Sequence, residues 1–542
     1  MPTRSSSTPA SCPSRHHAEA VSDPVYGAKW RAACDDDIKG KYTILKTWEL
    51  VESIPTGRRA IKGKWVFSVK YKPDGSIEKF KVKARYVGCD YSQIQGLDYV
   101  DSFCSTLRLE SLRCFLCGGC LDDDDLLEVD VVKAFPSAGD WDGTEIYLQQ
   151  PPGYEEEGYA ACRLLQPLEG TKQAGKLWMT GNAKTIASFG FERCAVEPNV
   201  WRKITPDGTM RLAIYMDNVG IRFPRGRRDL VDTHFIKPYG ERYSITIVGE
   251  PKVVLGIEIL RDRGDRTMLL TQTRYIDRIF TKFCSECTTK DFTIPVHQAG
   301  IDAFHHMLPG DEADRIAMGR RSLLELLGSL LWLWATATRP EIDFYVSWLC
   351  QFMSAPKLEH YQAGLSILSY LHCSRGLGIK YSADRPALKV YTDSSWGHMP
   401  RDFFGYAIIL GGAAITACAN RVKLMTKSTH ESELYAYAMA CKGLRFMQQL
   451  LEFEFNGYEL KLLSPVHTDS AGAIPYIKQS GATARTRHYE KIILYGREQC
   501  LNLISKPVWV AGTDQMADIF TNALDKTSFL RCRGKLLSIP GS

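Results

Sequence analysis

From Leu388 onward, strand-like and helix-like segments alternate, and this succession constrains the fold more than any other feature of the chain. The strand patterns occupy 388–393, 404–417, 462–468 and 504–510. The helix patterns occupy 430–452, the segment after 468, and 513–523. The order β-β-α-β-α-β-α predicts a separate α/β domain that begins near residue 385.

The preceding part of the chain shows a different mixture of patterns. With 542 residues the chain exceeds the ~250 residues of a large single domain, so we expect two to four domains. Short alternating runs at 42–100 include a hairpin pattern around Pro73-Asp74-Gly75. Helical patterns occupy 160–190 and 320–375, and 211–222 reads as two strands about a tight turn.

Composition and cysteine usage exclude several classes of protein. Apolar residues make up 44% and charged residues 24%, which excludes a wholly disordered, collagen-like or multi-pass membrane chain. The longest apolar run, 323–338, is shorter than the ~20 residues of a membrane span, so no membrane contact is expected. The 17 cysteines are scattered and no apolar signal segment precedes them. We therefore expect reduced thiols and an intracellular protein, cytoplasmic or nuclear and not secreted.

A basic stretch at 57–85 is the first candidate binding surface. It holds ten Lys or Arg residues against two acidic residues, although the net charge of the whole chain is only +6. Trp65, Phe67 and Tyr86 are interleaved with or adjoin these cations. Cations beside aromatic rings suit phosphate backbones and stacked bases, which indicates nucleic acid or a nucleotide. The alternative is an amphipathic hairpin with a solvated face.

Two aspartates at strand positions form a candidate metal pair. Asp130 lies within the apolar run 128–135, and Asp217 lies on the turn of 211–222. Two carboxylates from distant segments can bridge two Mg²⁺ ions, which activate a 3′-hydroxyl and stabilise a pyrophosphate leaving group. Taken alone, each aspartate is more often a turn or cap residue.

Four further acids lie at the ends of elements in the C-terminal domain. They are Asp393, Glu433, Asp469 and Asp518. As an ordered set they predict a two-metal cluster that directs water onto a phosphodiester, although each alone is commonly a cap or surface residue.

Two other patterns carry less weight. The cysteines at 114–120 and 284–287 have zinc-like spacing, but the first group falls in an apolar segment where cysteine serves as a small hydrophobe. The run Asp122 to Asp125 has no EF-hand spacing, so we expect a solvated acidic loop.

An ordered series of short motifs resembles a known family. In the first half these are Trp48-Glu49-Leu50-Val51, Lys64-Trp65-Val66-Phe67, Lys83-Ala84-Arg85, Gly96-Leu97-Asp98-Tyr99, Gln150-Pro151-Pro152-Gly153-Tyr154 and Lys172-Gln173-Ala174. Further along they are Leu255-Gly256-Ile257-Glu258, Thr338-Arg339-Pro340, Tyr391-Thr392-Asp393, Arg485-Thr486-Arg487-His488 and Ala517-Asp518-Ile519. Over about residues 28–530 the chain resembles the C-terminal part of a copia-type LTR-retrotransposon polyprotein, a reverse transcriptase followed by ribonuclease H.

The resemblance implies a multidomain α+β and α/β architecture, a right-hand polymerase of fingers, palm and thumb followed by a ribonuclease H-like α/β domain. The implied divisions are a disordered leader 1–27, fingers and palm 28–240, a helix-rich thumb or connection 241–385, a nuclease domain 386–530 and a tail 531–542. The implied partners are an RNA template, a DNA primer, an RNA–DNA hybrid and dNTPs, with two Mg²⁺ or Mn²⁺ ions per site. The oligomeric state stays open.

The resemblance also assigns roles to individual residues. Asp130 and Asp217 correspond to the palm carboxylates, Lys83 and Arg85 to the cations that hold the triphosphate, and Gln173 to a nucleotide-contacting glutamine. Asp393, Glu433, Asp469 and Asp518 correspond to the metal-binding acids of ribonuclease H. Glu431 is a rival to Glu433, which fits the helix pattern of that fold better. His488 is a possible auxiliary for proton transfer or product release, and a surface histidine is the alternative.

Departures from the family pattern indicate a decaying genomic copy. Asn218 stands where the family has a second adjacent aspartate, so the palm loses one negative charge opposite its cations. Glu169 and Thr171 stand where apolar groups are usual. We therefore expect an impaired polymerase beside a formally complete nuclease site. The alternatives are a non-catalytic nucleic-acid-binding relic and an unstable product with unpaired buried polar groups.

Overall fold

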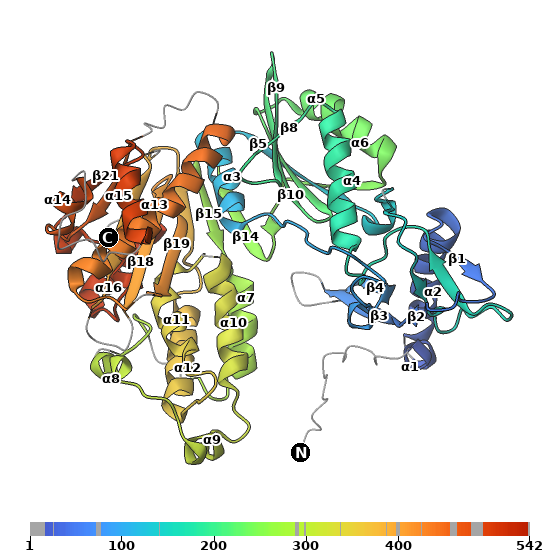
Figure 1. Ribbon diagram of the computed structural model, residues 1–542, viewed down its shortest axis with the longest axis horizontal. Coiled ribbons are helices and arrows are strands. Elements are labelled where there is room, and N and C mark those ends of the chain that lie inside the picture. Colours follow the sequence, from blue (N-terminus) through green and yellow to red (C-terminus); the bar gives the residue numbers. More distant parts are fainter. Residues whose placement is uncertain are drawn as a thin grey trace, which may run out of the picture.

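Figure 1 shows the chain as two halves that join across the upper part of the view. The computed structural model describes residues 17–24, 26–71, 77–139, 141–287, 292–297, 300–336, 338–385, 387–396, 402–423, 425–455, 463–478 and 491–539. The elements up to α6 lie in the centre and on the right, except α3, which lies beside α13 and β15; the C-terminal sheet lies on the left, and helices α7–α12 lie below it. The expected multidomain mixture of α+β and α/β structure is confirmed.

The N-terminal part combines two helices with a small sheet and a long hairpin. Its elements are α1 (His17–Ser22), α2 (Gly27–Ile38), β1 (Trp48–Val51), β2 (Ala60–Ile61), β3 (Gly63–Tyr71), β4 (Ile77–Gly88), β6 (Tyr147–Leu148) and β7 (Ala161–Leu164). The sheet has the order β1-β7-β6-β2, and β3 pairs with β4. Part of the expected disordered leader is therefore helical, since α1 lies within 1–27 and buries Ala20.

The β3–β4 hairpin has a buried and an exposed face. Trp65, Phe67 and Tyr86 are at most 8% exposed and belong to the local core. Lys83 and Arg85 occupy the alternate, exposed positions of β4, as the period of two along a strand requires. Lys83 and Arg85 therefore face solvent, whereas these three rings are core residues and do not offer their faces to bases. The turn at 73–75 lies outside the described residues.

The next part is built on a six-stranded sheet of order β12-β5-β11-β10-β9-β8. Its elements are α3 (Leu109–Leu121), β5 (Asp125–Val131), α4 (Ala174–Ser188), β8 (Glu192–Arg193), β9 (Val200–Thr205), β10 (Gly208–Tyr215), β11 (Asn218–Phe223), α5 (Arg228–Val231), α6 (Lys237–Arg242) and β12 (Ile245–Gly249). The helix expected at 160–190 is thus wrong at its start, because 161–164 pairs with β1 as β7.

A second sheet and a group of helices follow. The sheet order is β13-β14-β15-β16, with β13 (Val253–Val254), β14 (Ile257–Asp262), β15 (Thr267–Thr271) and β16 (Ile379–Ser382). The helices are α7 (Thr273–Phe283), α8 (Ile301–His305), α9 (Glu312–Met318), α10 (Leu323–Thr336), α11 (Asp343–Cys350) and α12 (Leu358–Cys373). In α7, Ile276, Ile279, Phe280 and Phe283 recur at helical spacing and are buried. Within the described ranges, no helix combines the length and the apolar character that a membrane crossing needs.

The C-terminal part is a five-stranded mixed sheet of order β19-β18-β17-β20-β21. Its elements are β17 (Lys389–Ser394), β18 (Phe403–Leu410), β19 (Ala413–Arg421), α13 (Thr429–Glu454), β20 (Ser464–Thr468), α14 (Ala473–Lys478), α15 (Lys491–Leu501), β21 (Ser505–Trp509), η7 (Gly512–Asp514), η8 (Ala517–Phe520) and α16 (Lys526–Leu537). Strands β17, β18 and β19 are antiparallel neighbours, whereas β17, β20 and β21 are parallel.

Three expectations for this part need correction. The strand expected at 404–417 is a hairpin, because Gly411 and Gly412 adopt positive φ angles of 63° and 83° and turn the chain. The helix expected at 513–523 is two short 3₁₀ turns, η7 and η8. The expected tail begins inside α16, which buries Phe529 and Leu536 completely.

The substitutions expected to leave buried polar groups unpaired have partners. The Glu169 carboxylate lies 3.1 Å from Nζ of the buried Lys41, and the Thr171 hydroxyl donates to the Leu168 carbonyl at 2.8 Å. Glu169 is therefore paired by charge, although its Oε2 makes no hydrogen bond within the described residues, and Thr171 is hydrogen-bonded. Cys114, Cys117 and Cys120 are buried within α3, as a hydrophobic role requires.

Candidate active sites

Three of the predicted nuclease acids lie at one edge of the C-terminal sheet. Asp393 lies near the end of β17, and Asp469 directly follows β20. Because β17 and β20 are parallel neighbours, their carboxyl ends meet at the same edge. Glu433 lies in the second turn of α13, which packs against β17 and β18. The fold therefore brings together residues that are 76 positions apart in the sequence, Asp393 and Asp469.

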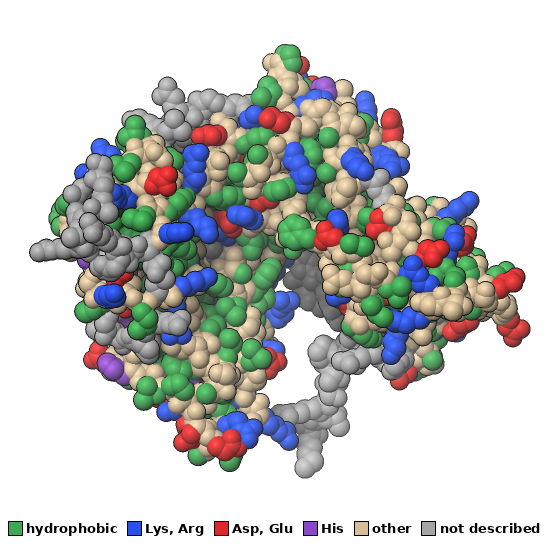
Figure 2. Space-filling model, in the orientation of Figure 1, with side chains coloured by type: hydrophobic (Ala, Val, Ile, Leu, Met, Phe, Trp, Pro, Cys, Tyr) green, Lys and Arg blue, Asp and Glu red, His purple; other side chains and the backbone are tan. Residues whose placement is uncertain are grey.

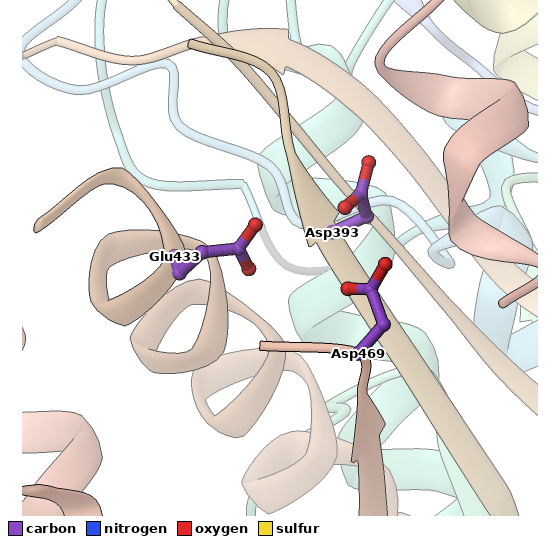
Figure 3. Close-up of side chains that lie close together, drawn as sticks. All are labelled: Asp393, Glu433 and Asp469. Carbon is purple, nitrogen blue, oxygen red and sulfur yellow. The ribbon is translucent and has the colours of Figure 1, made fainter. Parts of the chain in front are cut away.

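The three carboxylates point toward one another (Figure 3). One oxygen from each of Asp393, Glu433 and Asp469 lies within 4.8 Å of the other two. Asp393 is 6% exposed and Glu433 is 7% exposed, so the cluster is largely removed from water. Three converging acid oxygens are the donor set that Mg²⁺ or Mn²⁺ takes in proteins.

Two carboxyl groups of the cluster, those of Asp393 and Glu433, and the nearby Asp518 have raised pKa values. Burial, together with the charge of Asp469, raises the pKa of Asp393 to about 6, although a hydrogen bond from the Thr521 hydroxyl opposes this. Burial and the charges of Asp393 and Asp469 raise the pKa of Glu433 well above its usual range. Burial and the same two charges raise the pKa of Asp518, on η8, to about 8. Like charges in a dry pocket resist ionisation, and a cation would remove that resistance.

The residues present fit a divalent cation. Oε2 of Glu433 is buried and has no hydrogen-bond partner within the described part of the chain. A buried carboxylate oxygen without a partner is costly unless something positive binds it. The charges of Asp393 and Asp469 act on Asp518, yet its oxygens are not among the three that lie within 4.8 Å of one another.

The rival acid Glu431 has a different role. Its carboxylate accepts a hydrogen bond from the Lys427 amide at 2.7 Å, and its own amide donates to the Ser428 hydroxyl at 3.2 Å. Ser428 is the N-cap of α13, so Glu431 completes the start of the helix. The preference for Glu433 over Glu431 therefore agrees with the geometry.

Two residues that the sequence analysis missed support this site. Thr521 donates to Asp393 Oδ2, and Gln515 donates to the Thr392 carbonyl at 3.0 Å while its side-chain oxygen accepts from the Ala517 amide at 3.2 Å. Together they fix the segment that carries Asp518 against β17. In the sequence, the only indication of these supporting roles is that both residues lie beside the Ala517-Asp518-Ile519 motif.

The structure also brings the palm residues together. Asn218 starts β11 and is the direct strand partner of Asp130 on β5, while Asp217 lies on the adjoining turn. The Val131 amide donates to the Asp217 carbonyl at 2.9 Å, and Asn218 Nδ2 lies 3.4 Å from Asp217 Oδ1. Burial, then the charge of Asp130, raises the pKa of the neighbouring Glu128. The position that departs from the family, Asn218, therefore lies directly opposite the first predicted palm acid.

The remaining predicted residues lie elsewhere. Lys83 and Arg85 share the exposed face of β4. Gln173 is 1% exposed; its Nε2 donates to the Asp98 carbonyl at 3.0 Å and its Oε1 accepts from Gln93 at 3.1 Å. Its contact with a nucleotide therefore stays a prediction, as do the roles of the two cations. His488 lies outside the described residues.

Comparison with known proteins agrees with this arrangement. Residues 45–298 match the family of reverse transcriptases (RNA-dependent DNA polymerases). The Pol polyprotein of transposon TNT 1-94 from Nicotiana tabacum is 27% identical over 90% of this chain and 36% of its own length. The Pol polyprotein of transposon RE1 from Arabidopsis thaliana is 26% identical over 94% of this chain and 34% of its own length. The chain thus spans about a third of the length of these relatives.

A solved foamy viral protease–reverse transcriptase, in complex with double-stranded DNA, is also similar. It covers 89% of this chain and 69% of its own, with a TM-score of 0.48 and 11% identity. The sequence relatives carry the assignment. Residues 45–298 thus match the reverse transcriptase (RNA-dependent DNA polymerase) family, and over most of its length the chain is similar to the Pol polyproteins of retrotransposons.

Proposed function

We propose that this chain is an RNA-directed DNA polymerase with a ribonuclease H, in which the nuclease site is complete and the polymerase site is impaired. The observation that carries the nuclease half is the convergence of Asp393, Glu433 and Asp469 within 4.8 Å. The observation that carries the impairment is the pairing of Asn218 with Asp130. The proposed divisions are fingers and palm to about residue 240, a thumb or connection to about 385, and a nuclease domain that includes α16.

In the nuclease, Asp393, Glu433, Asp469 and Asp518 would hold two Mg²⁺ or Mn²⁺ ions. Bound ions of this kind supply an activated water and stabilise the departing oxygen of a phosphodiester. Thr521 fixes one oxygen of Asp393, so the other stays directed at the cluster. The burial of Asp393 and Glu433 excludes bulk water from the carboxylates, which strengthens their grip on a cation.

In the polymerase, Asp130 and Asp217 would hold the ions that serve attack of a primer 3′-hydroxyl on a dNTP. Asn218 places a neutral amide where a third carboxylate would stand. The exposed Lys83 and Arg85 would contact the triphosphate. Less negative charge at the palm means weaker binding of cations, and hence slower extension.

The proposed partners are an RNA template, a DNA primer, their hybrid and dNTPs. Figure 2 shows this face hollowed between the two halves, with Lys and Arg side chains spread over both. A hollow with cations on both sides suits a duplex with its phosphates. We propose an intracellular location, cytoplasmic or nuclear, in which thiols stay reduced.

A second candidate function is a non-catalytic nucleic-acid-binding relic, favoured by Asn218. Salt sensitivity of binding would not separate the two candidates, since both use cations against phosphates. Metal-dependent turnover of an RNA–DNA hybrid would separate the two candidates.

The deciding experiment is hydrolysis of a labelled RNA strand in an RNA–DNA hybrid by the purified chain. We expect cleavage with Mg²⁺ or Mn²⁺, no cleavage in EDTA, and loss of about 100-fold or more in Asp393→Asn. A folded protein that binds the hybrid and does not cleave it with either metal would leave the relic as the function.

A further inference from the structure

The aspartate run 122–125, expected to be a solvated loop, is engaged by arginines, although Asp122 remains exposed. Asp122 and Asp124 lie 3.6 and 3.1 Å from Arg222, which is fully buried on β11. Asp123 contacts Arg261 and Arg263 on or beside β14, both at 3.3 Å. The loop between α3 and β5 is therefore the centre of a charge network.

A carboxylate from the C-terminal part completes this network. Glu454, the last residue of α13, is fully buried and lies 3.2 Å from Arg222 and 3.8 Å from Arg211. The Arg222 guanidinium also donates to the Glu454 carbonyl and to the Phe115 carbonyl, both at 3.1 Å. The rings of Phe115 and Phe455 flank it at 5.7 and 5.4 Å. Arg222, on strand β11, thus contacts both the loop 122–125 and the end of α13.

The network joins two stiff elements that lead to the two candidate sites. On the palm side, β11 runs from Asn218, the partner of Asp130, to Arg222, about 13 Å along a strand. On the nuclease side, α13 runs from Glu433 to Glu454, about 32 Å along a helix. The Arg222 guanidinium on β11 and the Glu454 carboxylate at the end of α13 meet at 3.2 Å.

The chemistry of the junction favours one fixed arrangement. Burial raises the pKa of Glu454 and of Asp124, and the nearby arginines oppose that rise. A buried charge tolerates little displacement from its partners, because any gap leaves it neither hydrated nor paired. A purely apolar contact between α13 and the palm would slide more readily.

We propose that Arg222 is a positioning residue that fixes the nuclease domain to the palm through Glu454, and thereby sets the distance between the primer 3′-end and the point of RNA cleavage. This inference rests on the proposed function for its catalytic readout. The proposal also predicts that the two halves of the molecule are held at one separation. This separation can be measured without catalysis.

The catalytic test maps where the full-length chain cuts the RNA of a hybrid with a recessed DNA 3′-end. We expect one dominant cleavage position in the unaltered protein. In Arg222→Met the share of that position falls about threefold or more, while total cleavage of a hybrid without a recessed end changes by less than about twofold. Arg227→Met breaks an exposed ion pair with Asp229 on the same half and is the matched control, which keeps the position. An unchanged position in folded Arg222→Met overturns the proposal.

The second test measures distance and needs no activity. Spin labels carried by unnatural amino acids at the exposed positions Thr180 (α4) and Leu494 (α15) report the separation of the halves. We expect a narrow distribution that broadens about twofold in Arg222→Met. Should that variant fail to fold, Arg222→Met with Glu454→Leu removes both charges and gives the same broadening. A distribution unchanged in whichever variant folds overturns the proposal. Absence of cleavage with the expected broadening overturns only the proposed nuclease function.

Discussion

The buried carboxylate of Glu433 shows why the nuclease cluster is poised for a cation. It shares a dry pocket with Asp393 and Asp469, and Oε2 has no hydrogen-bond partner among the described residues. Each negative charge makes the next harder to form, so the metal-free site opposes folding when the groups ionise. A bound divalent cation converts the same charges into a stabilising interaction.

Replacement of Glu433 by glutamine separates these effects. Glu433→Gln should lower hybrid cleavage by about 100-fold or more, because a metal ligand is lost. In EDTA its melting temperature should equal or exceed that of the unaltered protein, because glutamine carries no cost of ionisation in this buried site. The rise in melting temperature on adding Mg²⁺ should disappear. The matched control is Glu431→Gln on the same helix, where an amide oxygen can still accept from Lys427 and activity should persist. Equal loss in both variants would contradict a metal role specific to Glu433.

The pH dependence of stability follows from the raised pKa values. The folded protein holds protons on Asp393 and Asp518 up to about pH 6 and 8, whereas the unfolded chain releases them near pH 4. In EDTA the free energy of unfolding should therefore fall as pH rises from about 5 to 8, by at most about 1.4 kcal/mol per pH unit for each proton. Melting curves with and without Mg²⁺ at these pH values test this. The stabilisation by Mg²⁺ should grow with pH, and a gain that is the same at both ends of the range would contradict it.

At the residue level the sequence analysis proposed acids that the fold brings together, although their roles stay predictions. Glu433 was chosen over Glu431 from the helix pattern, and the hydrogen bonds of Glu431 explain why the choice agrees with the geometry. The run Asp122 to Asp125 was predicted to be a solvated loop because consecutive acids are usually exposed. Its arginine partners lie about 100 or more residues away in the sequence, so only the fold reveals them. Gln515 acts through a hydrogen bond to the backbone, and Thr521 acts through a hydrogen bond to the Asp393 carboxylate. Such supporting roles leave little trace in a single sequence.

At the scale of elements, the close approach of β18 to η8 positions the fourth acid. Gly405 pairs with Asp393 across β17 and β18, and a Cβ there would lie 2.2 Å from Cβ of Phe520. Gly405→Ala should therefore push Phe520, and with it Asp518, out of place. We expect a loss of about 1–3 kcal/mol in stability and about tenfold or more in cleavage. Gly328→Ala in α10 is the matched control, because no atom lies within 4 Å of the added Cβ. It should stabilise the protein by up to about 1 kcal/mol without altering cleavage. Equal cleavage by both variants would contradict this account of β18.

Element type was predictable where the hydrophobic period was long, and less so where turns decided the outcome. The helix expected at 430–452 appears as α13, with Ser428 as its N-cap. The pair Gly411-Gly412 should have divided 404–417 into two strands, since both residues take positive φ angles. Strand β7 was missed because its pairing with β1 is more than 100 residues distant and leaves no local signal.

At the scale of the whole molecule, the sequence predicted several domains but could not predict how they meet. The resemblance implied separable parts, whereas a single buried core cluster includes residues of α3, β15, β16 and α13. The buried Arg222–Glu454 contact adds a polar link at the same junction. Such contacts depend on three-dimensional proximity between segments over 200 residues apart, which no periodicity encodes.

We propose that one chain carries a complete nuclease site and a palm site short of one carboxylate. The most direct test follows primer extension and RNA cleavage together on one labelled hybrid, with unaltered protein and Asn218→Asp side by side. We expect the unaltered chain to cleave and barely extend, and Asn218→Asp to extend about tenfold faster or more with cleavage unchanged. Equal extension by the two proteins, or no cleavage by either, would contradict the account.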